Sequence, residues 1–232
     1  NSTWYKSATF NLSTSGSWNC SVIATDRSNS SVTLNATFTV TREWQKYYGL
    51  TTGQLRLGSG AANYLLNWSA TYGQVVYVAE PTITINFDYL YPLGFCPNGN
   101  RSADDFNQSD SALGITSASR SIQELYDSNN DGIATQNETL RVFGRNVTGV
   151  PTARISNSSA FASGILWQGS AGSTVCYNGV QDLVFAVRIN KTQAGSYGTS
   201  DYELMIPQEL ASYKNSSNSL VNFYGEYRGQ TD

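Results

Sequence analysis

Strict alternation of apolar and polar residues is the feature of this sequence that most narrows its fold. Across residues 32–41 every second residue is apolar, and the residues between them are Thr or Asn. Successive side chains of a strand point to opposite faces, so the pattern predicts an antiparallel strand with one buried and one solvent-facing side. Shorter apolar runs between Gly, Pro and Asn turns predict further strands. These lie at residues 18–24, 64–68, 74–79, 82–90, 140–143, 164–168, 183–189, 201–206 and 220–227.

Helical periodicity is weak by comparison. One helix is predicted at residues 117–126, where Ile122 and Leu125 lie three residues apart. Many short strands with no alternation of strand and helix are typical of a sandwich of two antiparallel sheets. The sequence therefore predicts an all-β, immunoglobulin-like or pilin-like β-sandwich with at most one short helix.

The beginning of the chain repeats the strand pattern. Trp4, Ala8, Phe10 and Leu12 fall on one face of an extended chain, and a Ser- and Gly-rich stretch follows at residues 13–17. Such a strand either folds back onto its own sheet or is handed to a neighbouring molecule. The segment alone leaves both readings open. We expect two parts, an N-terminal donor strand and hinge at residues 1–17 and a sandwich body at residues 18–232.

Charge and hydropathy exclude several classes of partner. Charged residues make up 13% of the chain and the net charge is −3, which gives no basic surface for nucleic acid. No apolar run approaches the ~20 residues of a membrane-spanning helix. The chain starts at Asn1 without Met or leader, so we expect a mature, exported form.

Sequons for N-glycosylation are more frequent than chance predicts. The chain has 21 Asn and 52 Ser or Thr in 232 residues. That composition gives roughly five N-x-[ST] matches by chance, and the sequence has thirteen. The excess predicts a heavily N-glycosylated protein on the cell surface. The acceptor residues are Asn1, Asn11, Asn19, Asn29, Asn35, Asn67, Asn100, Asn107, Asn137, Asn146, Asn157, Asn190 and Asn215.

Three cysteines are present, so two of them can pair in an oxidising environment. Cys96 in GFCPNG and Cys176 in TVCYNG have similar loop contexts, which favours their pairing over the other two choices. Cys20 would then be a buried thiol.

The chain contains no histidine, which removes Ser-His-Asp and Cys-His catalysis. The composition still allows hydrolysis by a pair of carboxylates, although acidic residues in polar loops are more often simply solvated. The acidic candidates are Asp104, Asp105, Asp110, Glu124 and Asp201. An aromatic cluster in WQKYY, formed by Trp44, Tyr47 and Tyr48, fits either a sugar-binding platform or core packing. We expect no enzymatic activity.

The stretch DSNNDGIATQNE, residues 127–138, matches the calcium-loop template D-x-[DN]-x-[DN]-G-x5-E. Gly132 allows the sharp turn that the template needs. The same letters also describe an Asn-, Asp- and Gly-rich turn that holds no ion, and both readings stay open. No cofactor is required, and a bound calcium ion would act as a structural clip. Its ligands would be Asp127, Asn129, Asp131, Ile133 and Glu138.

The N-terminal alternating strand, the sandwich body and the sequon load together resemble the subunit of archaeal surface filaments, the thread pilins, whose fold is similar to that of bacterial type I pilins. The resemblance implies a head-to-tail homopolymer in which each N-terminal strand fills a groove of the next subunit. Trp4, Ala8, Phe10 and Leu12 would be the donor residues. The alternative is a monomeric secreted module, either glycan-binding or a carboxylate-type glycoside hydrolase.

Overall fold

The computed structural model describes residues 16–25, 31–40, 44–56, 64–69, 74–79, 83–115, 121–154, 160–207 and 222–225. The chain forms two compact units, Asn1–Glu43 and Trp44–Asp232. Antiparallel sheets dominate both, which confirms the predicted all-β, sandwich-like class.

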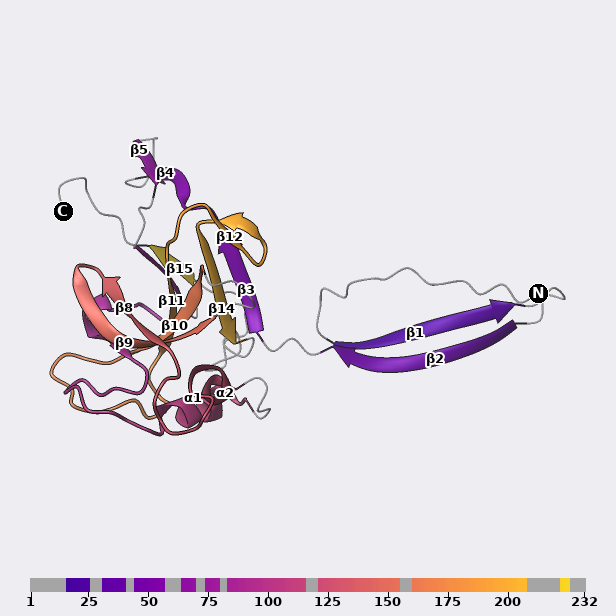
Figure 1. Cartoon of the computed structure of the whole chain (residues 1–232), viewed down its shortest axis with the longest axis horizontal. Helices are drawn as coiled ribbons and strands as arrows, with labels where there is room; N and C mark the ends of the chain where they lie inside the picture. Colours follow the sequence, from indigo (N-terminus) through magenta and orange to yellow (C-terminus); the bar gives the residue numbers. More distant parts are fainter. Residues whose placement is uncertain are drawn as a thin grey trace. The chain divides into compact units, whose positions relative to one another are not determined.

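The first unit is built on one antiparallel pair of strands (Figure 1). β1 (Gly16–Thr25) pairs with β2 (Ser31–Val40) along its whole length. The alternating segment predicted at residues 32–41 is thus a strand. The expected donor residues Trp4, Ala8, Phe10 and Leu12 lie outside the described residues. The division that we predicted after residue 17 stays a prediction, because residues 1–15 lie outside the described residues; Gly16 and Ser17 belong to β1.

A seven-stranded antiparallel sheet forms the centre of the second unit (Figure 1). Six strands follow one another in the order β15-β6-β11-β10-β9-β8, and β7 pairs with β10 beside β9. Their bounds are β6 (Val75–Ala79), β7 (Leu90–Pro92), β8 (Asn137–Val142), β9 (Arg145–Arg154), β10 (Ala162–Gln168), β11 (Leu183–Arg188) and β15 (Asn222–Gly225).

Both faces of the central strands β6, β10 and β11 are buried, because their successive residues enter two different cores. Phe185 faces the core that is covered by α1 (Asp105–Leu113), α2 (Ile122–Tyr126) and β14 (Tyr202–Pro207). Its neighbour Val184 faces the other core, which includes Leu140 of β8 and Val150 of β9. The 3-10 helix η1 (Phe87–Tyr89) packs against this second core through Phe87.

Three further strand pairs complete the described part of the second unit. β3 (Trp44–Gly49) lies antiparallel beside β14, with Tyr202 opposite Gly49 and Pro207 opposite Trp44 (Figure 1). β4 (Thr52–Arg56) pairs with β5 (Tyr64–Ser69), and β12 (Gln193–Gly195) pairs with β13 (Gly198–Ser200).

Several elements differ from the sequence-based expectation, among them a helix and a strand. The polar segment after Cys96 contains α1, so the described residues hold two α-helices where at most one was predicted. Only Phe106 and Leu113 of α1 are large buried apolar residues, and its other buried side chains are polar, so the helical period is weak. The strand predicted at residues 82–90 is also wrong, because most of that segment is irregular or belongs to η1.

One disulfide joins Cys96 to Cys176, as predicted, and closes a loop with a sequence separation of 80. It links the segment after β7 to the segment between β10 and β11. Cys20 lies on β1. Within the described part of the chain, no helix combines the length and the apolar character that crossing a membrane requires.

Candidate functional site

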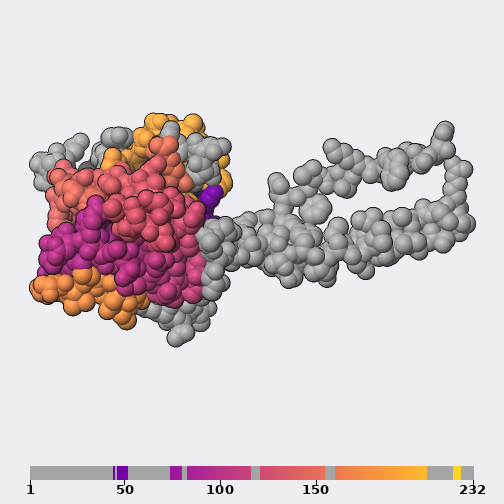
Figure 2. Space-filling model, turned by 60° about the horizontal axis from the view of Figure 1, so that its bottom comes forward, coloured from indigo at the N-terminus to yellow at the C-terminus, as the bar shows by residue number. Residues whose placement is uncertain are grey.

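Most of the residues that the sequence marked as chemically interesting lie in the segments 83–115 and 121–154. Atoms of these segments, coloured magenta to salmon, make up much of one face of the second unit (Figure 2). They include the calcium-like loop, four of the five acidic candidates and four of the sequons. These two segments therefore hold most of the candidate residues.

The calcium-like loop is closed by hydrogen bonds within the protein. Asp127 is fully buried, and its Oδ2 accepts from the backbone N–H of Gly132 at 2.9 Å and from Nε2 of Gln123 at 2.6 Å. Its Oδ1 accepts from the backbone N–H of Asp131 at 3.3 Å. Gly132 has a φ of 76°, and a Cβ there would lie 2.5 Å from the Cβ of Ala103. The expected role of Gly132 in a sharp turn is confirmed.

The other expected calcium ligands have protein partners as well. Asp131 accepts from the side-chain amide of Asn129 at 2.8 Å and from the backbone N–H of Ile133 at 2.8 Å. Glu138 lies on β8, where its carboxylate is 2.7 Å from the guanidinium of Arg188. Burial raises the pKa of Glu138, and the charge of Arg188 opposes this shift. Calcium binding therefore stays a prediction.

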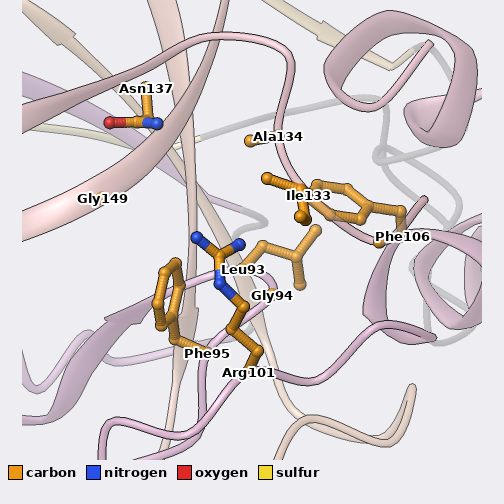
Figure 3. Close-up of a pocket in the computed structure, with 10 residues that line it drawn as sticks. Leu93, Gly94, Phe95, Arg101, Phe106, Ile133, Ala134, Asn137 and Gly149 are labelled. Atoms are coloured by element: carbon orange, nitrogen blue, oxygen red, sulfur yellow. The ribbon is translucent and has the colours of Figure 1, made fainter. Parts of the chain in front are cut away.

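A very small cavity lies beneath this loop, between Gly132, Ile133, Phe95 and Arg101 (Figure 3). Its volume is about 10 Å³, close to the space that a single water molecule needs. The guanidinium of Arg101 sits 5.0 Å from the centre of the Phe95 ring, and a Cβ on Gly149 would contact the same ring at 3.2 Å. The packing is too close here for a substrate.

A larger hollow of about 450 Å³ lies between α1 and α2. It brings together two of the acidic candidates, Asp110 and Glu124, with Asp127 and the sequon residue Asn107. Both carboxylate oxygens of Asp110 have partners within the protein. They accept from the backbone N–H groups of Ile122 at 2.5 Å and Gln123 at 3.0 Å. It therefore holds the start of α2 against α1. Burial raises the pKa of Asp110, and these two hydrogen bonds oppose the shift.

Asp105 has a similar role at the start of α1. Its carboxylate is fully buried and accepts from the backbone N–H of Gly94 at 3.0 Å and from the hydroxyl of Ser102. Burial raises the pKa of Asp105 to about 6, although both hydrogen bonds favour the charged form. The neighbouring carboxylate of Asp104, which is exposed, adds to the increase.

Asp201, the fifth acidic candidate, binds three segments together at the start of β14. Its Oδ2 accepts from the backbone N–H and the hydroxyl of Thr51, at 2.8 and 2.9 Å, and its Oδ1 accepts from the backbone N–H of Thr192 at 3.1 Å. Burial alone would raise the pKa of Asp201. The hydrogen bonds and the charge of Lys191 outweigh burial and hold the pKa below its usual value.

The buried carboxylates share one structural role. Each accepts hydrogen bonds from backbone N–H groups that would otherwise be buried without a partner, which is costly. Asp105, Asp110, Asp127 and Asp201 all hold loops or element ends in this way. Sequence reasoning identified the acidic residues but could not separate solvated carboxylates from buried ones. The spacing of backbone donors around a carboxylate is a property of the fold alone.

The aromatic cluster of WQKYY splits between core and surface. Trp44 packs near Tyr126, with ring centres 6.4 Å apart, and Tyr47 meets Phe223 edge-to-face at 5.2 Å. Core packing is thus correct for Trp44 and Tyr47. Tyr48 is 54% exposed and points outward.

Tyr48 stacks on Tyr197 from the turn between β12 and β13, with ring centres 5.0 Å apart and planes at 11°. Lys46 places its ammonium 5.9 Å from the centre of the Tyr197 ring. Glu203, opposite Tyr48 in the strand pair, is fully buried and accepts from the backbone N–H groups of Ser196 at 3.0 Å and Tyr197 at 3.1 Å. Glu203 therefore fixes the turn that presents Tyr197. No local sequence signal pointed to Tyr197 or Glu203.

The sequons occupy both strands and loops. Asn100, Asn107, Asn137 and Asn146 are exposed, whereas Asn190 is half-buried and donates from Nδ2 to the carbonyl of Ala160 at 3.3 Å. Exposure leaves room for a glycan at the first four, and glycosylation stays a prediction. Asn19, Asn35 and Asn67 lie on β1, β2 and β5, while Asn1, Asn11, Asn29, Asn157 and Asn215 lie outside the described residues.

Comparison with known proteins gives no relative. No family model, no curated protein and no solved structure matches this chain.

Proposed function

We propose that this chain is the structural subunit of an extracellular, heavily N-glycosylated filament. Each copy donates its N-terminal strand to the next copy, so that the filament grows head-to-tail by donor-strand complementation. The protein has no catalytic role in this proposal. It requires no cofactor, and its partners are further copies of itself and the covalent glycans.

The observation that carries the proposal is the period-two pattern of the N-terminal segment in front of a separately organised body. The chain divides into two compact units, Asn1–Glu43 and Trp44–Asp232. The two cores of the body are built from residues beginning at Val75, with Trp44 and Tyr47 packed against one of them. The sequence places Trp4, Phe10 and Leu12 on one apolar face, and burial in a groove of the next copy would cover it.

Three further observations agree with the proposal. The exposed positions of Asn100, Asn107, Asn137 and Asn146 suit a glycan coat. The buried carboxylates hold loops in place, a use that leaves little room for acid–base chemistry, and the chain has no histidine. The Cys96–Cys176 disulfide fits an oxidising environment outside the cell.

Light scattering and electron microscopy of the purified glycoprotein test the proposal. We expect filaments or a ladder of oligomers, and we expect deletion of residues 1–14 to abolish them. Phe10→Asp and Leu12→Asp place a charge on the apolar face and should also block assembly. Thr9→Asp, on the opposite face, is the matched control and should assemble. A monodisperse glycosylated monomer, or polymer from the deleted chain, would contradict the proposal.

The exposed Tyr48–Tyr197 pair supports one alternative, a monomeric glycan-binding module. Sugar rings stack on exposed aromatic faces, and Glu203 accepts hydrogen bonds from the turn that carries Tyr197. A monomer that binds glycans, and that loses binding in Tyr197→Ala, would favour the alternative over the filament.

A further inference from the structure

The hollow between α1 and α2 carries a glycosylation sequon in its own wall. The two helices lie side by side (Figure 1), and the space of about 450 Å³ between them falls within the ~300–1,000 Å³ of typical small-ligand sites. Asn107 of α1 belongs to the wall of the hollow. Asn100 and Asn146, which are also exposed sequon residues, do not line it, and Asn137 lines only the very small cavity beneath the calcium-like loop. A glycan on Asn107 would therefore begin beside a space that can hold it.

The side-chain amide of Asn107 is available to carry a sugar. Asn107 is exposed, and in the part of the chain that the structure describes its amide makes no hydrogen bond. The amide of Asn190, by contrast, already donates to the carbonyl of Ala160 at 3.3 Å. A sugar bonded to Nδ2 of Asn107 replaces one N–H hydrogen, so the linkage costs the folded protein none of its described hydrogen bonds.

The wall of the hollow suits a neutral ligand rich in hydroxyl groups. Its described lining is polar except for Ile115. It includes the exposed side chains of Ser111, Glu124, Ser128 and Asn130. These groups can donate hydrogen bonds to sugar hydroxyls or accept hydrogen bonds from them. The described lining holds three carboxylates and no basic residue, which disfavours a phosphate or another anionic ligand. A glycan of neutral sugars fits this chemistry.

We propose that the first sugars of a glycan on Asn107 lie in this hollow and hydrogen-bond to its polar wall, so that the glycan joins α1 to α2. The inference rests on the N-glycosylation in the proposed function and gives one of the glycans a binding site on the body. α2 has only five residues, too few for a stable helix in isolation, and Asp110 of α1 holds its start. Sugars between the two helices add a second connection between them.

The third residue of the sequon sets the order of events. Ser109 is fully buried, and its hydroxyl donates to the carbonyl of Asp105 at 2.8 Å within α1. This hydroxyl is part of the N-x-[ST] signal, so the sugar must be attached before α1 folds. In that step Nδ2 of Asn107 bonds to the anomeric carbon of a phosphate-activated sugar donor, the bond from that carbon to the phosphate breaks, and a proton passes to solvent. α1 and α2 then fold beside a glycan that is already in place.

Hydrogen exchange of the purified glycoprotein, read by mass spectrometry, tests the site. Peptide mapping first shows whether Asn107 carries a glycan. Asn107→Gln removes that glycan, and Asn146→Gln, which removes an exposed sequon on β9 outside the hollow, is the matched control. We expect residues 122–131 to exchange roughly tenfold faster in Asn107→Gln, the effect of one or two lost hydrogen bonds, and to be unchanged in Asn146→Gln.

Variants of the wall keep the test independent of the change at Asn107 itself. Ser111→Ala combined with Glu124→Ala removes hydrogen-bonding groups from both helices. Any direct effect of these changes on α2 appears with and without the glycan and cancels in the comparison. We expect the pair to speed the exchange of residues 122–131 several-fold more in the glycosylated protein than in the Asn107→Gln background. Equal effects in the two backgrounds would overturn the inference.

The outcomes separate this inference from the proposed function. If Asn107 is unmodified while other sequons carry glycans, or if Asn107→Gln and Asn146→Gln exchange alike, the inference is wrong and the filament proposal stands. If the protection of residues 122–131 survives in Asn107→Gln but is lost when every glycan is removed, a sugar from another position fills the hollow and the assignment to Asn107 is wrong. If no sequon carries a glycan, the inference fails together with the glycan coat, while electron microscopy still decides whether filaments form.

Discussion

Replacing Asp201 tests whether its buried carboxylate holds the segment that follows β3 against the start of β14. Asp201→Ala removes the acceptor of three hydrogen bonds, two of them from Thr51. Thr51 is only 4% exposed, so water cannot replace its lost bonds. Thr192 is exposed, and its N–H can turn to solvent.

The expected loss follows from the two donors of Thr51. A buried donor left without a partner costs about 1–3 kcal/mol, so the pair costs about 2–6 kcal/mol. At a central value of ~4 kcal/mol, the melting temperature falls by about 8–16 °C for a domain of about 150–250 residues. Asp201→Asn keeps the shape and one acceptor oxygen, and should lose about half as much.

Calorimetry at neutral pH measures this effect, with Asp88→Ala as the control. Asp88 is exposed on η1, so its replacement should change the free energy of unfolding by less than ~0.5 kcal/mol. The pKa of Asp201 is lowered in the folded protein. Its contribution is therefore present above the unfolded pKa of about 3.9 and is lost as pH falls through the folded value. If Asp201→Ala and Asp88→Ala have the same melting temperature, the carboxylate of Asp201 does not hold these segments together.

Three other predictions concern the same body. The pKa of Asp105 is raised to about 6, so stability falls as pH rises from about 4 to about 6, and Asp105→Asn should flatten that slope in urea titrations. Replacing Cys96 and Cys176 by Ser should cost ~3–5 kcal/mol, measured by thermal unfolding; an unchanged melting temperature would refute this. If calcium binds between Asp127 and Glu138, a chelator should lower the melting temperature and elemental analysis should find the ion. An unchanged melting temperature and the absence of the ion would together refute calcium binding.

Strands with a continuous apolar run or a strict alternation were largely predictable from the sequence. The apolar runs at residues 74–79 and 183–189 correspond to β6 and β11, and the alternation at residues 32–41 corresponds to β2. β9 was missed because it contains Gly149 and Pro151, which are typical of turns. Gly149 has a φ of 75° and lies where the register with β8 shifts, and Pro151 lies beyond the described pairing of β9 with β10.

The site was less predictable than the strands, for a physical reason. Asp110 and the start of α2 are twelve residues apart, and Thr51 and Asp201 are separated by 150 residues. Such pairs depend on tertiary structure, so no local pattern predicts them. The same holds for the stack of Tyr48 on Tyr197, which needs the pairing of β3 with β14 and the turn held by Glu203.

The most direct test of strand donation is capture of the missing segment in trans. The protein lacking residues 1–14 is mixed with a synthetic peptide of residues 3–13, and its melting temperature and mass are measured. The account predicts that the peptide raises the melting temperature and leaves the protein unpolymerised, because a free peptide fills the acceptor but links no further copy. A Phe10→Asp peptide should have no effect. A melting temperature unchanged by the native peptide would contradict the account.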